Sequence, residues 1–404
     1  MSRPLDVIVF GASSFVGQIL VRHLWERHGA DGELRWALAG RSESRLRAVR
    51  DSLGERAAGL PLLVADSSDA AALHRLCEQA RVIVSTVGPY ALYGSTLVAA
   101  CADTGTDYCD LTGEVQWMRR MITAHEATAQ RTGARIVHAC GFDSIPSDLG
   151  MRFLQEAAIA RFGQPLRQVS MRVRLTGGVS GGTVASMVNF FQELADNPAL
   201  ARDIRNPHLL AGISGGARQT EVLRPTRDAF SDNWLAPFIM AAINTRVVHR
   251  SNALSGWRWG QDLAYDEAWA TGSGVRGLAM ATGFTAALGG FVAGAAIGPV
   301  RRLLSRHVLP KPGEGPSPEE QRNGRFELTF HGRDDAGHRL TARVTGERDP
   351  GYGATARMLG EAAACLAQDM AGRPGGFWTP ASLLGDALQQ RLQAHAGMRF
   401  QLLD

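Results

Sequence analysis

The chain opens with a short apolar segment, a glycine-containing turn and a stretch with helical periodicity. The residues read Asp6-Val-Ile-Val-Phe-Gly11-Ala-Ser-Ser-Phe-Val-Gly17-Gln-Ile-Leu-Val. In a strand–turn–helix unit of this kind, the free N–H groups and the positive end of the helix dipole meet a bound diphosphate. Gly11 permits the tight turn and Gly17 allows the helix to pack closely on the sheet, while Ser14 replaces the usual middle glycine. The N-terminus therefore predicts a dinucleotide-binding site, with the hydroxyls of Ser13 and Ser14 as added donors to the phosphate.

Strand-like and helix-like segments alternate over the first 150 residues. Apolar runs typical of buried strands occupy 7–10, 35–39, 62–65, 82–86 and 136–139, and helical patterns lie between them at 16–28, 43–53, 69–79, 96–103 and 118–132. This alternation predicts an α/β fold with a Rossmann-type, doubly wound parallel sheet. Asp69, which precedes an Ala-Ala-Leu run, is a candidate helix N-cap.

The pattern changes beyond Gly150, and 404 residues exceed the usual size of one hydrophobic core. We expect three parts: 1–150 as the nucleotide-binding domain, 151–350 as a second α/β domain with a mixed sheet, and 351–404 as a helical tail that packs back on the first domain. The further segments read as a strand at 169–175, a helix at 181–194, an irregular stretch at 197–269, a loop or linker at 310–324, antiparallel strands at 325–330 and 338–345, and a C-terminal helix with Leu359, Ala362, Ala363, Leu366 and Met370 on one face.

Composition excludes several classes of function. A net charge of +4 is too small to indicate a nucleic-acid partner. The five cysteines are scattered without a CxxC pair, so the sequence predicts neither a disulfide framework nor a metal site, and a reducing, cytoplasmic compartment fits. Lys311 is the only lysine among 43 basic residues and lies in a Pro/Gly-rich stretch, which argues against a Schiff-base lysine.

One apolar segment interrupts the second domain. Residues 277–300 contain no charged side chain, and a stretch of that length can cross a bilayer. Glycine and alanine dominate it, and Trp257, Trp259 and Trp269 precede it as an interfacial aromatic belt would. Three interpretations stay open: a buried helical hairpin, a peripheral contact with lipid, and a membrane span.

The end of the second predicted strand bears on cofactor choice. Sites selective for NAD place a carboxylate here to accept from the ribose 2′-hydroxyl, and no acid stands at 39–42. Arg41 and Ser42 follow Gly40 instead, and a guanidinium matches a 2′-phosphate through charge-assisted hydrogen bonds. The sequence therefore predicts NADP. Asp66, after the third strand, is either an adenine contact or a turn residue.

Two further strand ends face the same predicted crevice. The fourth strand runs into Ser85-Thr-Val-Gly-Pro-Tyr90, which places the backbone at Val87 and Gly88 along the cofactor. Tyr90 is either an acid or hydrogen-bond donor at the nicotinamide or substrate, or an aromatic lid residue without proton transfer. After the strand at 136–139, Asp143 and Ser144 are candidates to orient the carboxamide or polarise a substrate carbonyl, while Ser147 and Asp148 are candidate caps of the next helix.

These motifs, together with Asp107-Tyr-Cys-Asp-Leu-Thr-Gly-Glu114, Gly141-Phe-Asp-Ser-Ile-Pro-Ser-Asp148, Ser180-Gly-Gly-Thr183 and Gly375-Gly-Phe-Trp-Thr-Pro380, resemble the saccharopine dehydrogenase-like oxidoreductases. Within them the chain is most similar to the trans-acting enoyl reductase branch. The resemblance implies an NADP-binding Rossmann domain, a second α/β domain that closes over it, and reduction of polyketide or lipid enoyl thioesters. It implies that relatives with an apolar segment associate with lipid, and it transfers no catalytic residue.

Residues and resemblance together predict an NADPH-dependent reductase of an enoyl or carbonyl group on a small apolar substrate, either carrier- or CoA-linked. A lipid-associated NADP-binding scaffold without turnover and a reductase of a polar metabolite are the alternatives, and a homodimer is compatible with the sequence. Tyr90 and Asp143 are the catalytic candidates. The predicted cofactor-binding residues are Gly11, Ala12, Ser13, Ser14, Phe15, Val16, Gly17, Gly40, Arg41, Ser42, Asp66, Thr86, Val87, Gly88 and Pro89.

Overall fold

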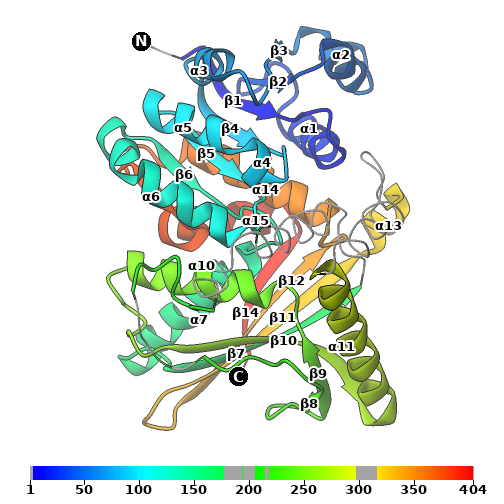
Figure 1. The fold of residues 1–404 in the computed structure, drawn as a ribbon, viewed down its shortest axis with the longest axis vertical. Coiled ribbons are helices and arrows are strands. Elements are labelled where there is room, and N and C mark those ends of the chain that lie inside the picture. Colours follow the sequence, from blue (N-terminus) through cyan, green and yellow to red (C-terminus); the bar gives the residue numbers. More distant parts are fainter. Residues whose placement is uncertain are drawn as a thin grey trace.

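A computed structural model describes residues 3–176, 193, 205–213, 217, 219–296 and 316–403 of the chain. The described residues form two seven-stranded sheets, one above the other in Figure 1, with helices between and around them. The helix expected at 181–194 and the Ser180–Thr183 motif lie outside the described residues, except for position 193.

The first sheet is parallel throughout, with the order β13-β6-β5-β4-β1-β2-β3. Its strands are β1 (Leu5–Phe10), β2 (Trp36–Gly40), β3 (Leu62–Val64), β4 (Ala80–Ser85), β5 (Asp107–Asp110), β6 (Arg135–Val137) and β13 (Gly376–Trp378). The predicted Rossmann-type sheet is thereby confirmed. Two strands escaped prediction, since β5 begins and ends with aspartate and β13 comes from the distant C-terminal part of the chain.

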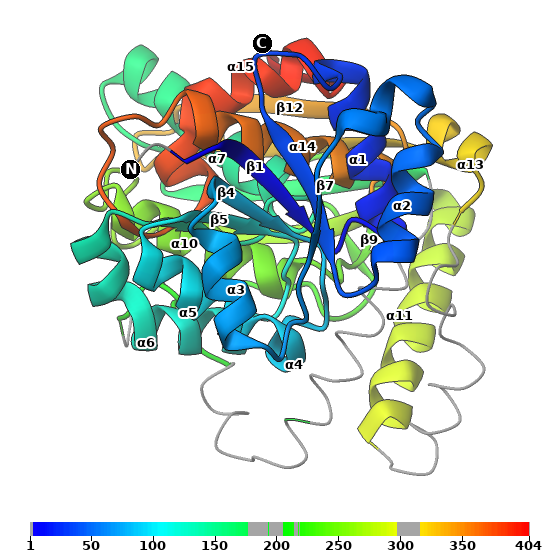
Figure 2. The same cartoon turned by 90° about the horizontal axis from the view of Figure 1, so that it is seen from above.

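Helices cover both faces of this sheet (Figure 2). Alternate side chains of β1 point to opposite faces: Val7 and Val9 belong to one buried cluster, and Ile8 and Phe10 to the other. The first face is covered by α1 (Phe15–His28) and α14 (Gly353–Gln368), and the second by α3 (Ala70–Cys77), α5 (Ser95–Thr104) and α6 (Val115–Thr132). Asp69 caps α3 as predicted, because its carboxylate accepts from the Ala72 N–H at 2.9 Å.

The C-terminal helix α14 packs on the first sheet, as the shared apolar face predicted. Gly360 permits a close approach of α14 to α1, since a Cβ there would lie 2.7 Å from Cδ2 of His23. The adjacent Glu361 carboxylate is buried and pairs with Nε2 of His23 at 3.0 Å and with Nε of Arg27 at 3.4 Å. These contacts of Glu361 link α14 to α1.

The second sheet is mixed, with the order β14-β12-β11-β7-β10-β9-β8. Its strands are β7 (Gln168–Thr176), β8 (Thr226–Arg227), β9 (Asn233–Pro237), β10 (Ala264–Ser273), β11 (Arg325–Arg333), β12 (Arg339–Glu347) and β14 (Met398–Leu403). Among the strands that the structure describes in this sheet, only β7 and β10 pair in parallel, and β11 and β12 form the expected antiparallel pair. Because β13 lies in the first sheet and β14 in the second, the C-terminal part of the chain contributes a strand to each sheet.

Helices lie between the two sheets and pack on the second one (Figure 1). Helix α7 (Ile145–Phe162) packs closely on the sheet, since a Cβ at Gly150 would lie 2.5 Å from the Phe330 ring. Helix α10 (Ala241–Leu254) lies in the stretch predicted to be irregular, and that prediction is wrong for this part of it. Polar residues such as Asn244 and His249 are buried in α10, so it lacks the amphipathic period that reveals a surface helix.

The apolar segment forms one helix, α11 (Gly274–Ala296), which lies beside β9 and β10 (Figure 1). The buried-hairpin interpretation is wrong for this described part, because Val275 and Met280 are 83% and 52% exposed. Residues 274–294 are long and apolar enough to cross a membrane by length and composition alone, and only 11% of that window is buried. The aromatic-belt interpretation fails for Trp259, which is buried, and for Trp269, whose ring packs edge-on against Phe284.

The remaining elements are short or peripheral. They are α2 (Glu43–Asp51), α4 (Tyr90–Tyr93), α13 (Pro318–Asn323), α15 (Gly385–His395), the 3₁₀ turn Glu55–Gly59 and the π turn Pro380–Leu384. Helix α13 occupies part of the segment 310–324, which was predicted to be a loop or linker. Residues 310–315 of that segment lie outside the described residues.

Candidate active site

The opening turn offers unpaired backbone donors at the N-terminus of α1. Gly11 has a φ of +88°, which favours glycine, and a Cβ at Gly17 would lie 2.1 Å from the Gly11 carbonyl oxygen. The N–H groups of Ser13, Phe15 and Val16 have no backbone acceptor among the described residues. Such a row of N–H groups at a helix start fits a diphosphate.

Ser14 has a structural duty in this turn. Its Oγ accepts from the Gly17 N–H at 2.9 Å and lies 2.9 Å from Oγ1 of Thr86, which also donates to the Gly11 carbonyl. The Ser14 hydroxyl already caps α1 and contacts Thr86. The structure therefore favours this capping role over the predicted role as an added phosphate donor. Thr86, after β4, fixes the turn from the neighbouring strand.

The residues after β2 and β3 lie at the same edge of the sheet. Arg41 is exposed, and Ser42 caps α2 by accepting from the Arg45 N–H at 3.4 Å. Asp66 forms a turn, since its Oδ1 accepts from the N–H and hydroxyl of Ser68. Hydrogen bonds from Ser68, together with the charge of Arg41, hold the pKa of Asp66 below its usual value.

The Tyr90 side chain is held by the backbone on both sides. Its hydroxyl donates to the Ser85 carbonyl at 3.0 Å and accepts from the Leu111 N–H at 3.1 Å. Burial and the Asp110 carboxylate raise the pKa of Tyr90 well above its ordinary value. Its ring lies 5.6 Å from the Trp117 ring. This geometry favours the lid interpretation of Tyr90 over proton transfer.

Glu114, which the sequence did not single out for a role, fixes the same loop. Its two carboxylate oxygens accept from the N–H groups of Tyr90 and Ala91 at 2.8 and 2.9 Å. Glu114 could have been found as an acidic residue shortly after a strand end, but the sequence did not predict that strand, β5. Through these bonds Glu114 holds the segment 86–91 along the edge where a cofactor would lie.

Asp143 lies in the turn between β6 and α7 and is partly exposed. No other side chain makes a hydrogen bond to its carboxylate among the described residues. Burial, opposed by a hydrogen bond from its own backbone N–H and assisted by the Asp110 charge, raises the pKa of Asp143 to about 7. A carboxyl group with a pKa near neutrality, at a strand end facing a cofactor edge, is a candidate general acid.

The predicted caps of α7 are wrong. Ser144 occupies the N-cap position, and its hydroxyl donates to Oδ1 of Asn244 at 2.9 Å. Ser147 accepts from Nδ2 of Asn244 at 3.0 Å. Asp148 is buried and accepts from the Ser251 hydroxyl and, at 2.8 Å, from the Ala381 N–H. These groups tie α7 to α10 and to the C-terminal part of the chain.

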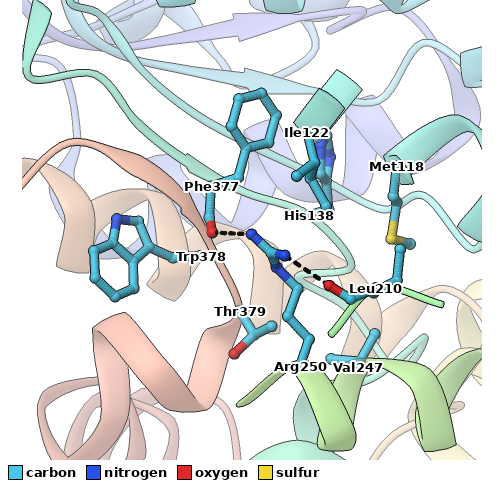
Figure 3. Close-up of a pocket in the computed structure, with 9 residues that line it drawn as sticks. All are labelled: Met118, Ile122, His138, Leu210, Val247, Arg250, Phe377, Trp378 and Thr379. Carbon is cyan, nitrogen blue, oxygen red and sulfur yellow. Dashed lines mark hydrogen bonds between the residues drawn. The ribbon is translucent and has the colours of Figure 1, made fainter. Parts of the chain in front are cut away.

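A small cavity lies beside this edge, between α6, α10 and the end of β13 with the adjoining Thr379 (Figure 3). Arg250 projects into it and donates to the carbonyls of Leu210 and Phe377. His138, in its wall, places Nδ1 2.8 Å from Oδ2 of Asp110. The sequence did not identify these residues, because buried pairs between a strand end and a distant helix leave no local pattern.

The structure thus brings the predicted residues to one edge of the first sheet. The opening turn follows β1, Gly40 ends β2 and is followed by Arg41 and Ser42, Thr86 to Pro89 follow β4, and Asp143 follows β6. In a parallel sheet the carboxyl ends share one edge, and there a crevice binds the ligand. Asp143 is close enough to Tyr90 for its charge to raise the pKa of that hydroxyl.

Comparison with known proteins identifies the family of the chain. The profile of the family described as "Saccharopine dehydrogenase NADP binding domain" matches residues 7–137. A Mycobacterium tuberculosis protein named as a candidate trans-acting enoyl reductase is 40% identical over an alignment of 420 positions, which covers 99% of this chain and 97% of that protein. The trans-acting enoyl reductase of Mycobacterium ulcerans is 38% identical over an alignment of 413 positions, which covers 96% of each chain.

The fold has a counterpart among solved structures. Apo saccharopine dehydrogenase (L-Glu forming) from Saccharomyces cerevisiae superposes with a TM-score of 0.59 at 12% identity, covering 99% of this chain and 100% of that one. At that identity the likeness concerns the fold alone. The chain belongs to the saccharopine dehydrogenase-like oxidoreductases, in the trans-acting enoyl reductase branch, and is an NADP-dependent enzyme.

Proposed function

We propose that this enzyme reduces the carbon–carbon double bond of an enoyl thioester on an apolar acyl chain, carried by CoA or a carrier protein, and that Asp143 provides the proton. The observation that carries the proposal is the Asp143 carboxyl at the edge of the first sheet where the cofactor would lie. It is partly buried, accepts no hydrogen bond from a side chain of the described residues, and has a pKa of about 7. The experiment is NADPH turnover with a panel of enoyl thioesters of increasing chain length. Silence across the panel, with NADPH bound, would favour a scaffold instead.

The opening turn and the neighbouring strand ends would hold the coenzyme. The N–H groups of Ser13, Phe15 and Val16 bind the diphosphate, with Gly11, Ala12 and Gly17 providing the close approach. The adenine-side contacts are Gly40, Arg41, Ser42 and Asp66, and the nicotinamide-side contacts are Thr86, Val87, Gly88 and Pro89. When bound, NADPH supplies the hydride that adds to the β carbon of the enoyl group.

The chain's own residues supply the rest of the reaction. Asp143 holds its proton at a carboxyl oxygen and gives it to the α carbon or to the enolate oxygen, which balances the added hydride. Tyr90, fixed by the Ser85 and Leu111 backbone, closes the edge and helps to exclude water. Because the geometry leaves the Tyr90 hydroxyl no free role, we assign proton transfer to Asp143 alone.

Arg41→Ala tests the 2′-phosphate contact. Loss of a charge-assisted hydrogen bond worth about 1.5–3 kcal/mol lowers NADPH affinity by about tenfold or more, whereas NADH affinity stays unchanged. Fluorescence titration with both coenzymes measures this. Arg45→Ala is the matched control, since Arg45 is also exposed and lies on α2. An equal, small loss for NADPH and NADH in the Arg41 variant would contradict the assigned role.

The same proposal places α11 on a lipid surface, as a peripheral contact of a cytoplasmic enzyme. All five cysteines are free and buried, which fits a reducing compartment. Within α11 only Arg276 is charged, and Val275, Leu278, Met280 and Val292 are among the exposed large apolar side chains. A long apolar helix face at the surface is where an acyl-chain enzyme would meet its substrate's membrane.

Flotation with phosphatidylcholine vesicles tests the lipid contact. Replacing Val275 and Leu278 by serine should reduce the floated fraction by about tenfold or more, because burial of each side chain contributes about 1.5 kcal/mol or more. Leu223→Ser with Leu402→Ser is the control, since both leucines are exposed elsewhere. If no wild-type protein floats and it elutes as a dimer that the α11 variant loses, a second copy rather than lipid covers α11.

A further inference from the structure

The turn that carries Asp143 is fastened on both sides by residues from distant parts of the chain. On one side the Phe142 N–H donates to Oγ1 of Thr355 at 3.0 Å. On the other side the Ser144 hydroxyl donates to Oδ1 of Asn244 at 2.9 Å. The Asp143 carboxylate, between these two anchors, makes no side-chain hydrogen bond within the part of the chain that the structure describes. Its position therefore depends on its neighbours.

Thr355 is well placed to act as a fixed anchor. It lies in the first turn of α14, is 5% exposed, and donates its own hydroxyl proton to the Pro350 carbonyl at 2.7 Å. With its proton engaged there, Oγ1 can only accept from the Phe142 N–H. The preceding loop is rigid in turn, because the Asp349 carboxylate accepts from the N–H groups of residues 351–353.

The same loop contacts the opening turn at the start of α1. The Tyr352 ring meets the Phe15 ring edge to face, with centroids 4.9 Å apart. Phe15 lies at the start of α1, where the diphosphate is expected. One short segment, 349–355, therefore contacts both the predicted phosphate-binding turn and the turn of Asp143.

Packing around the Asp143 carboxyl is tight on the Thr355 side. A Cβ at Gly141 would lie 2.8 Å from Oδ2 of Asp143, 2.9 Å from Cγ2 of Thr355 and 2.6 Å from Cδ2 of Leu111. The methyl group of Thr355 and the Leu111 side chain thus line the space next to the carboxyl. Movement of the 141–143 backbone would open this space to water.

We propose that Thr355 is a positioning residue for the proton donor: by accepting from the Phe142 N–H it holds the Asp143 carboxyl partly buried against the coenzyme edge. The inference rests on the proposed role of Asp143. The titratable groups that face Asp143 are Asp110 from β5, Tyr90 from α4 and Cys140 from its own turn. None of these groups is a cation that would lower the pKa of Asp143, which burial raises to about 7.

The test compares Thr355→Val, which keeps the shape and loses the hydroxyl, with Thr355→Ser, which keeps the hydroxyl. Thr106→Val is the matched control, because Thr106 is also buried and donates to a backbone carbonyl, that of Cys77, at the opposite edge of the sheet. Two readouts are used: kcat/KM against pH with NADPH and trans-2-dodecenoyl-CoA, and infrared titration of the carboxyl group in coenzyme-free protein, with Asp143→Asn assigning the band.

We expect the valine variant to titrate about one pH unit or more below wild type and to lose about tenfold in kcat, with KM for NADPH within about twofold. The serine and Thr106 variants should behave as wild type. A wild-type titration midpoint and pH profile in Thr355→Val would overturn the inference; Thr355→Ala replaces it if the valine variant does not fold. If Asp143→Asn keeps wild-type turnover, the proposed role of Asp143 as proton donor fails, and the positioning role of Thr355 fails with it. If Asp143→Asn loses turnover while Thr355→Val keeps the wild-type profile, only the positioning role fails.

Discussion

Asp143→Asn is expected to lower kcat by about 10²–10³-fold while KM for NADPH stays within about twofold. Asparagine keeps the size of the side chain and cannot give up a proton, and general acid catalysis typically contributes 10²–10⁴-fold. In wild type the active form is the protonated one, so kcat/KM should be flat below the pKa of about 7 and fall tenfold per pH unit above it. The Asp143→Asn variant should not show this decrease in kcat/KM above the pKa. Steady-state kinetics from pH 5 to pH 9 measures both effects.

Asp148→Asn is the control for this result. Burial raises the pKa of Asp148 to about 7 as well, but its two oxygens accept hydrogen bonds from Ser251 and Ala381. We expect the Asp148→Asn variant to be less stable than wild type and to keep the decrease in kcat/KM above pH 7.

The raised pKa of Asp143 also makes stability depend on pH. Because the pKa is higher in the folded than in the unfolded protein, ionisation of Asp143 lowers the free energy of unfolding as pH rises from about 4 to about 7. The unfolding temperature of Asp143→Asn should therefore fall less than that of wild type over this range.

Gly17→Ala is expected to weaken NADPH binding by about a hundredfold. The added Cβ would lie 2.1 Å from the Gly11 carbonyl oxygen and 2.8 Å from Oγ of Ser14, so the start of α1 must move away from the turn. That movement displaces the N–H groups of Phe15 and Val16 from the diphosphate. An overpacking cost of about 3 kcal/mol corresponds to about two orders of magnitude in Kd. Isothermal titration calorimetry with NADPH measures the change.

Gly59→Ala controls for the loss of a glycine in the same domain. A Cβ at Gly59 meets nothing within 4 Å, so this variant should bind NADPH as wild type does. Circular dichroism establishes that the Gly17 variant is folded. Wild-type affinity in folded Gly17→Ala would contradict the placement of the diphosphate at this turn.

The first half of the fold was predictable because its signals are local. The apolar runs of β1, β2 and β4 and the glycines of the opening turn lie close together in sequence, and each run forms a strand buried on both faces. The expected return of the C-terminal helix also followed from one apolar face, now seen as α14 against α1. Strands β5 and β13 were missed, since one is flanked by acids and the other is only three residues long.

The candidate site was predictable only in part. Sequence order places Arg41 and Asp143 at strand ends, and the parallel sheet then brings them to one edge. The partners that decide their chemistry come from far along the chain: Thr355 is 213 residues from Phe142, and Asn244 is 100 residues from Ser144. Such contacts arise from the packing of α10 and α14 and leave no local pattern. The Tyr90 hydroxyl is held by backbone groups of Ser85 and Leu111, and a backbone partner leaves no mark in the sequence.

Deuterium transfer tests the proposed reaction most directly. NADPH carrying deuterium at both C4 positions of the nicotinamide is incubated with the protein and trans-2-enoyl thioesters of several chain lengths, and the products are analysed by mass spectrometry. We predict a saturated thioester with one deuterium at the β carbon and a solvent proton at the α carbon. If NADPH binds and no enoyl thioester gains deuterium at any chain length, enoyl reduction by this chain is contradicted.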